Sequence, residues 1–175
     1  LRDGETFAVD ISAGYYSGGG AANAALGHIS TMLTGLPLST AYPAYADYQF
    51  IDVSRGVGGD GVGLLDESRN WGVLDRDGKT RLSLPLKFKF QSMDETEADL
   101  PAFGRLQLTA QVKLEAREGT YSNAAQARYA RYPRYVGLRI VPRWFDAKTP
   151  LRLEGVVIDA EGHTQAGAAI EITAE

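Results

Sequence analysis

The chain has 175 residues, of which 44% are hydrophobic, and a formal net charge of -4. It can therefore bury a core, but it lacks the positive field that a general nucleic-acid or anionic-membrane surface needs. There is no cysteine, which excludes disulfides, thiolate metal ligands and cysteine nucleophiles, and no apolar run reaches the roughly 18 residues of a membrane span, so no direct membrane insertion is expected.

Alternation of apolar and polar residues with a period of two runs along the chain and predicts half-buried β-strands. The run Leu106–Leu114 is the clearest, and Leu82–Phe90 alternates in the same way around Pro85, which indicates an edge strand or a bulge. A short helix competes only within residues 21–33, where alternation favours a strand. In chain order, the expected strands are Phe7–Ala13, Leu26–Leu33, Tyr48–Val53, Leu82–Phe90, Leu106–Leu114, Gln126–Tyr132, Val136–Val141, Leu151–Ile158 and Ala168–Thr173.

Turn sequences separate these runs. Asp75–Gly78, Glu118–Gly119 and Asp159–Gly162 supply residues that accept positive φ, and residues 35–63 and 94–99 are expected to be loops. Many short strands joined by such turns predict an all-β fold, namely an immunoglobulin/fibronectin-like antiparallel β-sandwich.

The glycine-rich stretch GYYSGGGAAN (residues 14–23) raises the question of a phosphate loop or a nucleophile. A phosphate loop needs Lys and then Ser or Thr after its last glycine, and Ala21 and Ala22 stand there instead. A nucleophile elbow around Ser17 needs a glycine where Tyr15 stands. The stretch is therefore expected to turn the chain between strands.

Catalytic, metal and cofactor sites have no support in the sequence. His28 and His163 are the two histidines; neither has a second histidine at metal-ligand spacing, and both are expected to be structural. The Asp75–Gly78 turn begins like a calcium loop, but Lys79, Thr80 and Leu86 stand where that loop needs an oxygen ligand, glycine and glutamate.

Arginines and aromatic residues interleave in ARYARYPRYVGLRIVPRW (residues 127–144), as they do in single-stranded nucleic-acid channels. Period-two alternation, however, puts residues 128, 132 and 134 on one face and 129, 131 and 135 on the other, and the remainder of the chain is acidic. The expectation is therefore two strands with an Arg/Tyr ladder near a domain junction, with no nucleic-acid partner.

The sequence of residues 135–172 resembles the start of a macroglobulin-like domain of the bacterial alpha-2-macroglobulins. In that family a Y-x-G-L-R strand opens a domain, a tryptophan follows, and a later strand ends in V-D-x-x-G-x-x-x-x-G-x-x-V-x-V. Residues 9–26 and 41–50 are similar to the opening strand, glycine turn and F-P-x-Y-x-x-F-x-F segment of the preceding domain. The matching positions of the later domain are Tyr135, Gly137, Leu138, Arg139, Trp144, Asp159, Gly162, Gly167, Ile170 and Ile172.

The resemblance implies a macroglobulin-like β-sandwich domain in residues 1–135 and the first strands of a second, truncated macroglobulin-like domain in 136–175. It implies scaffold domains of a broad-spectrum endopeptidase inhibitor of the periplasm, active in bacterial defence, which traps proteases after bait cleavage. The partners would be other macroglobulin-like domains of the parent chain and the proteases that the parent traps. The thioester cysteine of many members is absent here, and neither an enzyme activity nor a cofactor is expected.

An interdomain hinge is implied at the boundary of these two domains. Its residues would be Tyr135, Gly137, Leu138, Arg139 and Trp144.

Two other functional classes remain open at this stage. A secreted or periplasmic β-sandwich adhesion module would use Tyr42, Tyr45 and Tyr48 as a stacking platform for a ligand. An enzyme would need polar groups that converge in a pocket, which the sequence does not suggest.

Overall fold

A computed structural model describes residues 1, 4–50, 71–86, 100–114, 119–141 and 152–170. The strands in these ranges are β1 (Thr6–Ser12), β2 (Ala25–Gly35), β3 (Lys79–Pro85), β4 (Phe103–Leu114), β5 (Gly119–Ala130), β6 (Arg134–Val141) and β7 (Arg152–Asp159). Between β2 and β3 lie a single helical turn, α1 (Leu38–Ala41), and a 3₁₀ turn, η1 (Pro43–Tyr45). The chain is thus all-β, as predicted.

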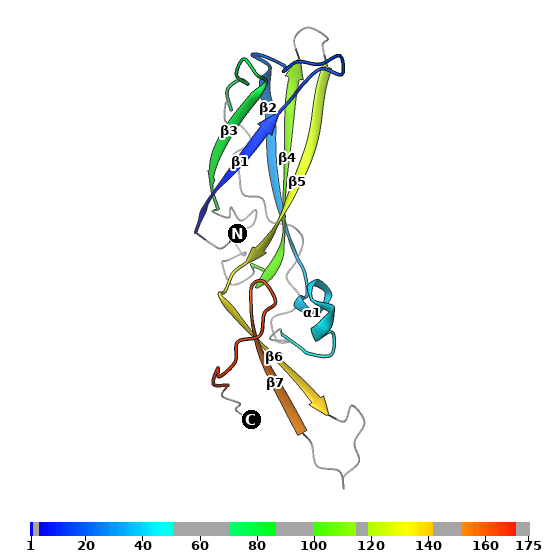
Figure 1. Cartoon of the computed structure of the whole chain (residues 1–175), viewed down its shortest axis with the longest axis vertical. Helices are drawn as coiled ribbons and strands as arrows, with labels where there is room; N and C mark the ends of the chain where they lie inside the picture. The colour runs from blue at the N-terminus through cyan, green and yellow to red at the C-terminus, as the bar shows by residue number, and fades with distance from the viewer. Residues whose placement is uncertain (2–3, 51–70, 87–99, 115–118, 142–151, 171–175) are drawn as a thin grey trace, which may run out of the picture.

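The strands form three antiparallel sheets: β1-β3, β2-β4-β5 and the hairpin β6-β7. The first two sheets face each other and bury one core between them, which includes Ile11 and Leu84 on one side and Ile29, Leu108 and Val112 on the other. This is the predicted antiparallel β-sandwich. The β6–β7 hairpin lies at the opposite end of the molecule from the glycine-rich turn (Figure 1).

Most expected strands are confirmed, because period-two alternation reports a strand with one face buried. The alternation of residues 106–114 lies within β4, that of 7–13 within or beside β1, and residues 26–33 form a strand and not a helix. The strands expected at 136–141 and 151–158 are β6 and β7. Pro85 ends β3, which among the described residues pairs only with β1 and is there an edge strand, and residues 87–90 lie outside the described ranges.

Four expectations were wrong in part. β5 begins at Gly119, seven residues before the expected strand. The sequence did not indicate this start because residues 120–128 are exposed on both faces, so apolar and polar residues do not alternate there. Residues 48–50 make only a single bridge, between Gln49 and Leu138, and 168–170 are not in a strand; 51–53 and 171–173 lie outside the described residues. The loop expected at 35–63 contains α1 and η1, which are too short for a helical period to be visible.

Two turns share one geometry and one sequence pattern, VLDRDGKT (73–80) and VIDAEGHT (157–164). In the first, the Asp75 carboxylate accepts the N–H groups of Asp77 and Lys79 at 2.9 and 2.8 Å. In the second, the Asp159 carboxylate accepts the N–H groups of residues 161 and 163 at 3.0 and 2.8 Å. Gly78 and Gly162 have φ of 71° and 88°, as the turn expectation requires.

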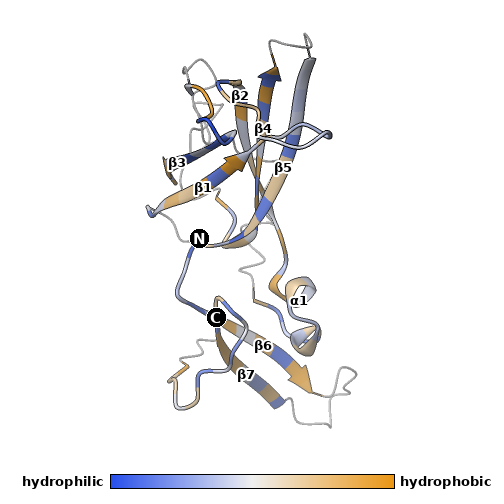
Figure 2. Cartoon of the chain, turned by 45° about the horizontal axis from the view of Figure 1, so that its top comes forward, coloured by the Kyte–Doolittle hydropathy of each residue, from blue (hydrophilic) through white to orange (hydrophobic). Residues whose placement is uncertain are grey.

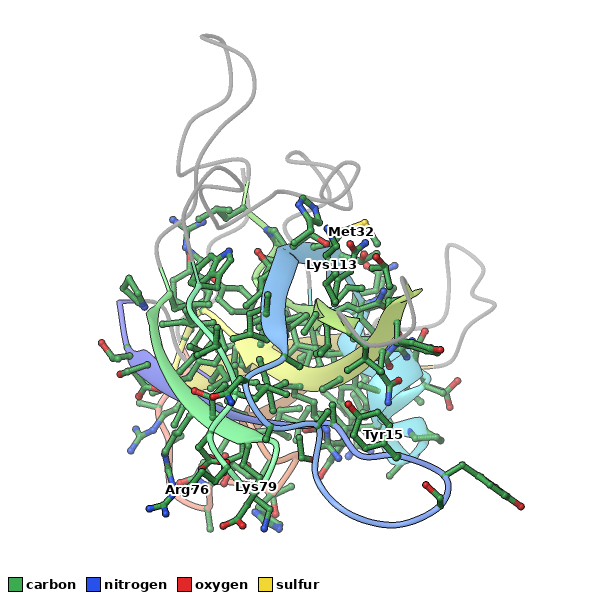
Figure 3. The ribbon with its side chains drawn as sticks, turned by 90° about the horizontal axis from the view of Figure 1, so that it is seen from above. Tyr15, Met32, Arg76, Lys79 and Lys113 are labelled. Atoms are coloured by element: carbon green, nitrogen blue, oxygen red, sulfur yellow. The ribbon has the colours of Figure 1, made fainter. Side chains whose placement is uncertain are left out.

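The stretch 14–23 turns the chain after β1, which confirms the expectation (Figure 3). Gly14 and Gly20 bridge across its base, the Tyr15 N–H donates to the carbonyl oxygen of Gly19 at 3.0 Å, and Gly18 and Gly19 have φ of 95° and 87°. Tyr15 packs against the sandwich core, whereas the whole side chain of Tyr16 is exposed. The glycines therefore allow the backbone conformation that this turn requires.

Candidate functional site: the junction between the sandwich and the β6–β7 hairpin

A separate hydrophobic cluster joins the sandwich to the β6–β7 hairpin. It takes Leu38 from α1, Phe103 from the start of β4, Ala130 from the end of β5, Tyr135 from β6 and Ile158 from β7, all buried. Ile158 is fully buried at 0% exposure. α1, the start of β4, the stretch from the end of β5 into β6, and β7 are distant from one another in sequence. Apolar packing holds these four segments together at the point where the sandwich ends, beside α1 (Figure 1).

Two tyrosines of the predicted stacking platform hold the turn after β7. The Tyr42 hydroxyl donates to the carbonyl oxygen of Ala160 at 2.6 Å, and the Tyr45 hydroxyl donates to that of Gly162 at 3.0 Å. The Tyr42 hydroxyl also accepts a hydrogen bond from Nη1 of Arg128 on β5, at 2.8 Å. The two tyrosines are half-buried, and Tyr42 connects β5 of the sandwich to the turn after β7.

Gly162 is the residue that lets the Tyr42 ring approach this turn. A Cβ atom at position 162 would lie 2.6 Å from two carbons of the Tyr42 ring. Sequence reasoning identified Gly162 as a turn residue and as a position of the macroglobulin-like pattern. A single sequence does not reveal that an aromatic ring 120 residues away packs against it.

The third tyrosine of that group contacts β6. The Arg139 guanidinium lies 4.7 Å from the centre of the Tyr48 ring, a cation–π contact, and its Nε donates to the Glu154 carboxylate at 2.8 Å. Hydrogen bonding from Arg139 lowers the pKa of Glu154, and Nη2 of Arg152 adds a second contact at 3.2 Å. Arg139 therefore has an anion on one side and a π face on the other.

The segment 48–50 runs along the free edge of β6. Gln49 and Leu138 exchange two backbone hydrogen bonds, of 2.8 and 2.9 Å, and the Phe50 ring covers Gly137 so closely that a Cβ there would lie 2.6 Å from it. The hairpin thus gains a third backbone partner from the segment that follows η1.

Tyr135 ties β6 to the residues before β4. Its hydroxyl donates to the carbonyl oxygen of Ala102 at 2.7 Å and accepts the N–H of Tyr132 at 3.2 Å, while its ring packs edge-on against Phe103. Burial raises the pKa of the Tyr135 hydroxyl. The structure therefore brings four of the five predicted hinge residues, Tyr135, Gly137, Leu138 and Arg139, into contacts with sequence-distant segments; Trp144 lies outside the described residues.

The interleaved arginines and aromatics alternate as the period-two pattern predicts. Arg128 is exposed next to the fully buried Tyr129, and Arg134 is exposed next to the buried Tyr135. β5 and β6 are both strands, but they belong to different sheets and do not pair with each other.

The two histidines lie on separate elements. His28 is half-buried at a break in the β2–β4 register, and Nδ1 of the exposed His163 lies 3.3 Å from the Asp159 carboxylate. Within the described ranges, no three His, Asp or Glu residues are close enough together to hold a metal ion. No helix in those ranges is long and apolar enough to cross a membrane.

Tyr135→Phe is expected to lower the free energy of unfolding by about 1–2 kcal/mol, because the partly buried hydrogen bonds of its hydroxyl to the Ala102 carbonyl and from the Tyr132 N–H are lost. Urea unfolding followed by circular dichroism measures this. Tyr121→Phe, which removes a hydroxyl from a half-exposed ring on β5, is the matched control and is expected to change little. Equal losses in the two variants would contradict the role assigned to the Tyr135 hydroxyl.

The lowered pKa of Glu154 predicts that the stability of the fold depends on pH. Its folded-state pKa lies below the ordinary 4.5, so its contribution is complete above that value and is lost as the pH falls through the lowered pKa. Between about pH 6 and pH 3, Glu154→Gln is expected to lose less stability than the original chain, as measured by urea midpoints. Glu161→Gln, at an exposed turn position, should follow the original pH profile.

No protein-family model matches the sequence, and no curated protein matches it significantly. Among solved structures, Escherichia coli alpha-2-macroglobulin activated by porcine elastase matches 93% of this chain and 13% of its own, with 20% identity and a TM-score of 0.54. The native conformation of E. coli alpha-2-macroglobulin matches 94% of this chain and 10% of its own, with 19% identity and a TM-score of 0.51. The chain therefore spans only about an eighth or less of these neighbours, and the resemblance expected from the sequence is confirmed at the level of the fold. This chain has the all-β fold of a section of bacterial alpha-2-macroglobulin.

Proposed function

We propose that this chain is a scaffold unit of a bacterial alpha-2-macroglobulin, a periplasmic inhibitor that traps endopeptidases after they cut a bait segment. The observation that carries the proposal is the junction: apolar packing, two tyrosine hydroxyls and a backbone bridge hold the β6–β7 hairpin against the sandwich. A unit whose task is to set the orientation of its neighbours needs such a junction and needs no catalytic group.

In this proposal residues 1–135 are one macroglobulin-like domain and 136–175 begin the next. The partition is supported by the separation of the hydrophobic clusters. Two clusters lie within the sandwich. The third is formed by the ends of β4 and β5 together with β6, β7, the turn after β7 and the segment that contains α1 and η1.

The predicted hinge residues then act as a coupling element between the two domains. Tyr135 bonds to the Ala102 carbonyl, Arg139 to Glu154 and the Tyr48 ring, and Gly137 packs under Phe50. Motion of one domain would be passed to the other through these contacts, which is how packed junctions with discrete arrangements transmit a change. Trp144 stays a prediction for the same junction.

The partners of this unit would be other macroglobulin-like domains of the longer protein, and endopeptidases would be targets of that protein as a whole. The sequence contains no cysteine, so a thioester would have to be supplied by another part of the longer protein. The unit would serve bacterial defence in the cell envelope.

The proposal is tested by comparing the chain with the longer protein that contains it. With elastase or trypsin acting on a large protein substrate, the chain alone should leave the protease fully active, while the longer protein should be cut and then reduce cleavage. Inhibition by the chain alone, or tight binding of a glycan by it, would contradict the scaffold role.

A substitution pair tests the junction within the longer protein. Gly162→Ala places a methyl group against the Tyr42 ring, whereas Gly167→Ala has a similarly positive φ, 75° against 88°, and open space around it. Bait cleavage should be normal in both variants, and only Gly162→Ala should lower the fraction of protease trapped. Equal trapping by the two would remove the junction from the mechanism.

A further inference from the structure

In the part of the chain that the structure describes, no strand pairs with the outer edge of β5. β5 is the last strand in the order β2-β4-β5, and residues 120–128 are exposed on both faces. Its register with β4 runs without a break from Phe103 opposite Ala130 to Leu114 opposite Gly119. In such a ladder alternate residues turn their N–H and C=O groups toward β4, and those between turn theirs outward.

Leu1 shows which residues of β5 face outward. The Leu1 amino group donates to the carbonyl oxygen of Arg128 at 3.0 Å, and the Ala130 N–H donates to the carbonyl oxygen of Leu1 at 2.9 Å. One residue bonded to the two neighbours of Tyr129 is the pattern of a parallel bridge. The even-numbered residues from Thr120 to Ala130 therefore point their backbone groups away from β4.

The sequence of this edge has few of the features that keep strand edges unpaired. Residues 120–127, TYSNAAQA, contain no charge and no proline, the two commonest protections of natural edge strands. One local protection is present, because Oδ1 of Asn123 accepts the outward N–H of Ala124 at 2.8 Å. Figure 2 shows β5 pale along much of its length beside the strongly banded β4, with the N-terminus near its lower end.

We infer that the outer edge of β5, from Thr120 to Ala127, is a strand-acceptor site for an extended polypeptide joined to the amino group of Leu1. Continuity with the Leu1 bridge supports this occupant: a residue that reaches Leu1 through a peptide bond continues the same pairing along β5 in the parallel direction. Eight strand residues cover about 26 Å of this edge, and each second residue supplies the backbone groups that β5 lacks. This is β-strand addition, in which main-chain hydrogen bonds supply the affinity.

The test compares two forms of the full chain that carry eight-residue extensions at Leu1. One extension consists of alternating Thr and Val, and the other has proline at every position whose N–H would face β5. Hydrogen exchange measured by NMR should slow at least tenfold for the amides of Ser122, Gln126 and Arg128 with the first extension only. The amides of Tyr121 and Ala125, which already face β4, should exchange at unchanged rates.

The variant Asn123→Ala provides a second test of the same edge. Without an extension, the Ala124 amide of this variant should exchange faster than in the original chain, because its side-chain acceptor is gone. With the Thr/Val extension it should become protected like the other outward amides. Protection that is equal with both extensions would overturn the inference, and so would protection of the unextended chain that rises with its concentration, since the occupant would then be a second copy. No protection with the Thr/Val extension would overturn it as well.

Discussion

Gly20→Ala is expected to lower the free energy of unfolding by about 3 kcal/mol or more, although it adds a single methyl group at an ordinary φ. A Cβ atom at position 20 would lie 2.1 Å from the carbonyl oxygen of Asp77 and 2.7 Å from the backbone nitrogen of Gly78. Both contacts are with backbone atoms, so no side-chain rotation relieves them.

The two turns would have to separate to make room. The Ala13 N–H, at the start of the glycine-rich turn, joins the two turns by donating to the Gly78 carbonyl at 2.9 Å. The Ala13 carbonyl in turn accepts the Ala21 N–H across the base of the glycine-rich turn, at 2.9 Å. Moving the turns apart stretches these bonds and exposes Ala21, which is fully buried in the sandwich core. The loss therefore exceeds that of a simple turn substitution.

Gly18→Ala is the matched control for Gly20→Ala. Gly18 has a φ of 95° and nothing within 4 Å of a Cβ atom, so its substitution tests backbone strain without a clash and is expected to cost about 1–2 kcal/mol. Urea unfolding at neutral pH measures both variants. If Gly20→Ala were no less stable than Gly18→Ala, the close approach of the two turns would not exist in solution.

The sandwich could be predicted from the sequence wherever one face of a strand is buried. Leu106, Leu108, Val112 and Leu114 are buried on alternate positions of β4, so period-two alternation reports the strand directly. The beginning of β5 could not be predicted in this way. Thr120 to Arg128 are exposed on both faces, and no burial pattern marks them as a strand.

The sequence indicated the region of the junction but not the contacts that form it. The interleaved arginines and tyrosines, and the resemblance of residues 135–144, placed a boundary near Tyr135. The partners of that region come from Tyr42, Tyr45 and Phe50, whose positions depend on α1 and η1. A four-residue helix has no visible period, and hydroxyl-to-carbonyl contacts over more than 100 residues leave no local signal.

The same contacts give the tyrosine-rich segment a structural role. A stacking platform needs ring faces open to a ligand, whereas the Tyr42 ring lies against Gly162 and the Tyr48 ring lies under Arg139. The Tyr48 ring thus contacts β6, and the Tyr42 ring contacts the turn after β7. The tyrosines therefore support the scaffold proposal more directly than a ligand-binding role.

Ile158→Ala is expected to release the β6–β7 hairpin while the sandwich stays folded. Ile158 is fully buried in the junction cluster, and truncation of such a residue costs about 2–5 kcal/mol through lost burial and the cavity that remains. A two-stranded hairpin is marginal by itself in water, so this loss is comparable to what holds it in place. Hydrogen exchange of the β6 and β7 amides should then accelerate by about a hundredfold or more.

Ile29→Ala provides the comparison within the sandwich, since Ile29 is equally buried but belongs to the core between the two sheets. It should accelerate exchange in β2 and β4 and, because the hairpin packs on the ends of β4 and β5, in β6 and β7 as well. Ile158→Ala should leave the β2 and β4 amides at their original rates. This one-way dependence is what a junction between a complete domain and the start of the next one requires. If Ile158→Ala instead accelerated exchange equally in β2 and β7, the chain would be a single cooperative unit, and a domain boundary at residue 135 would be wrong.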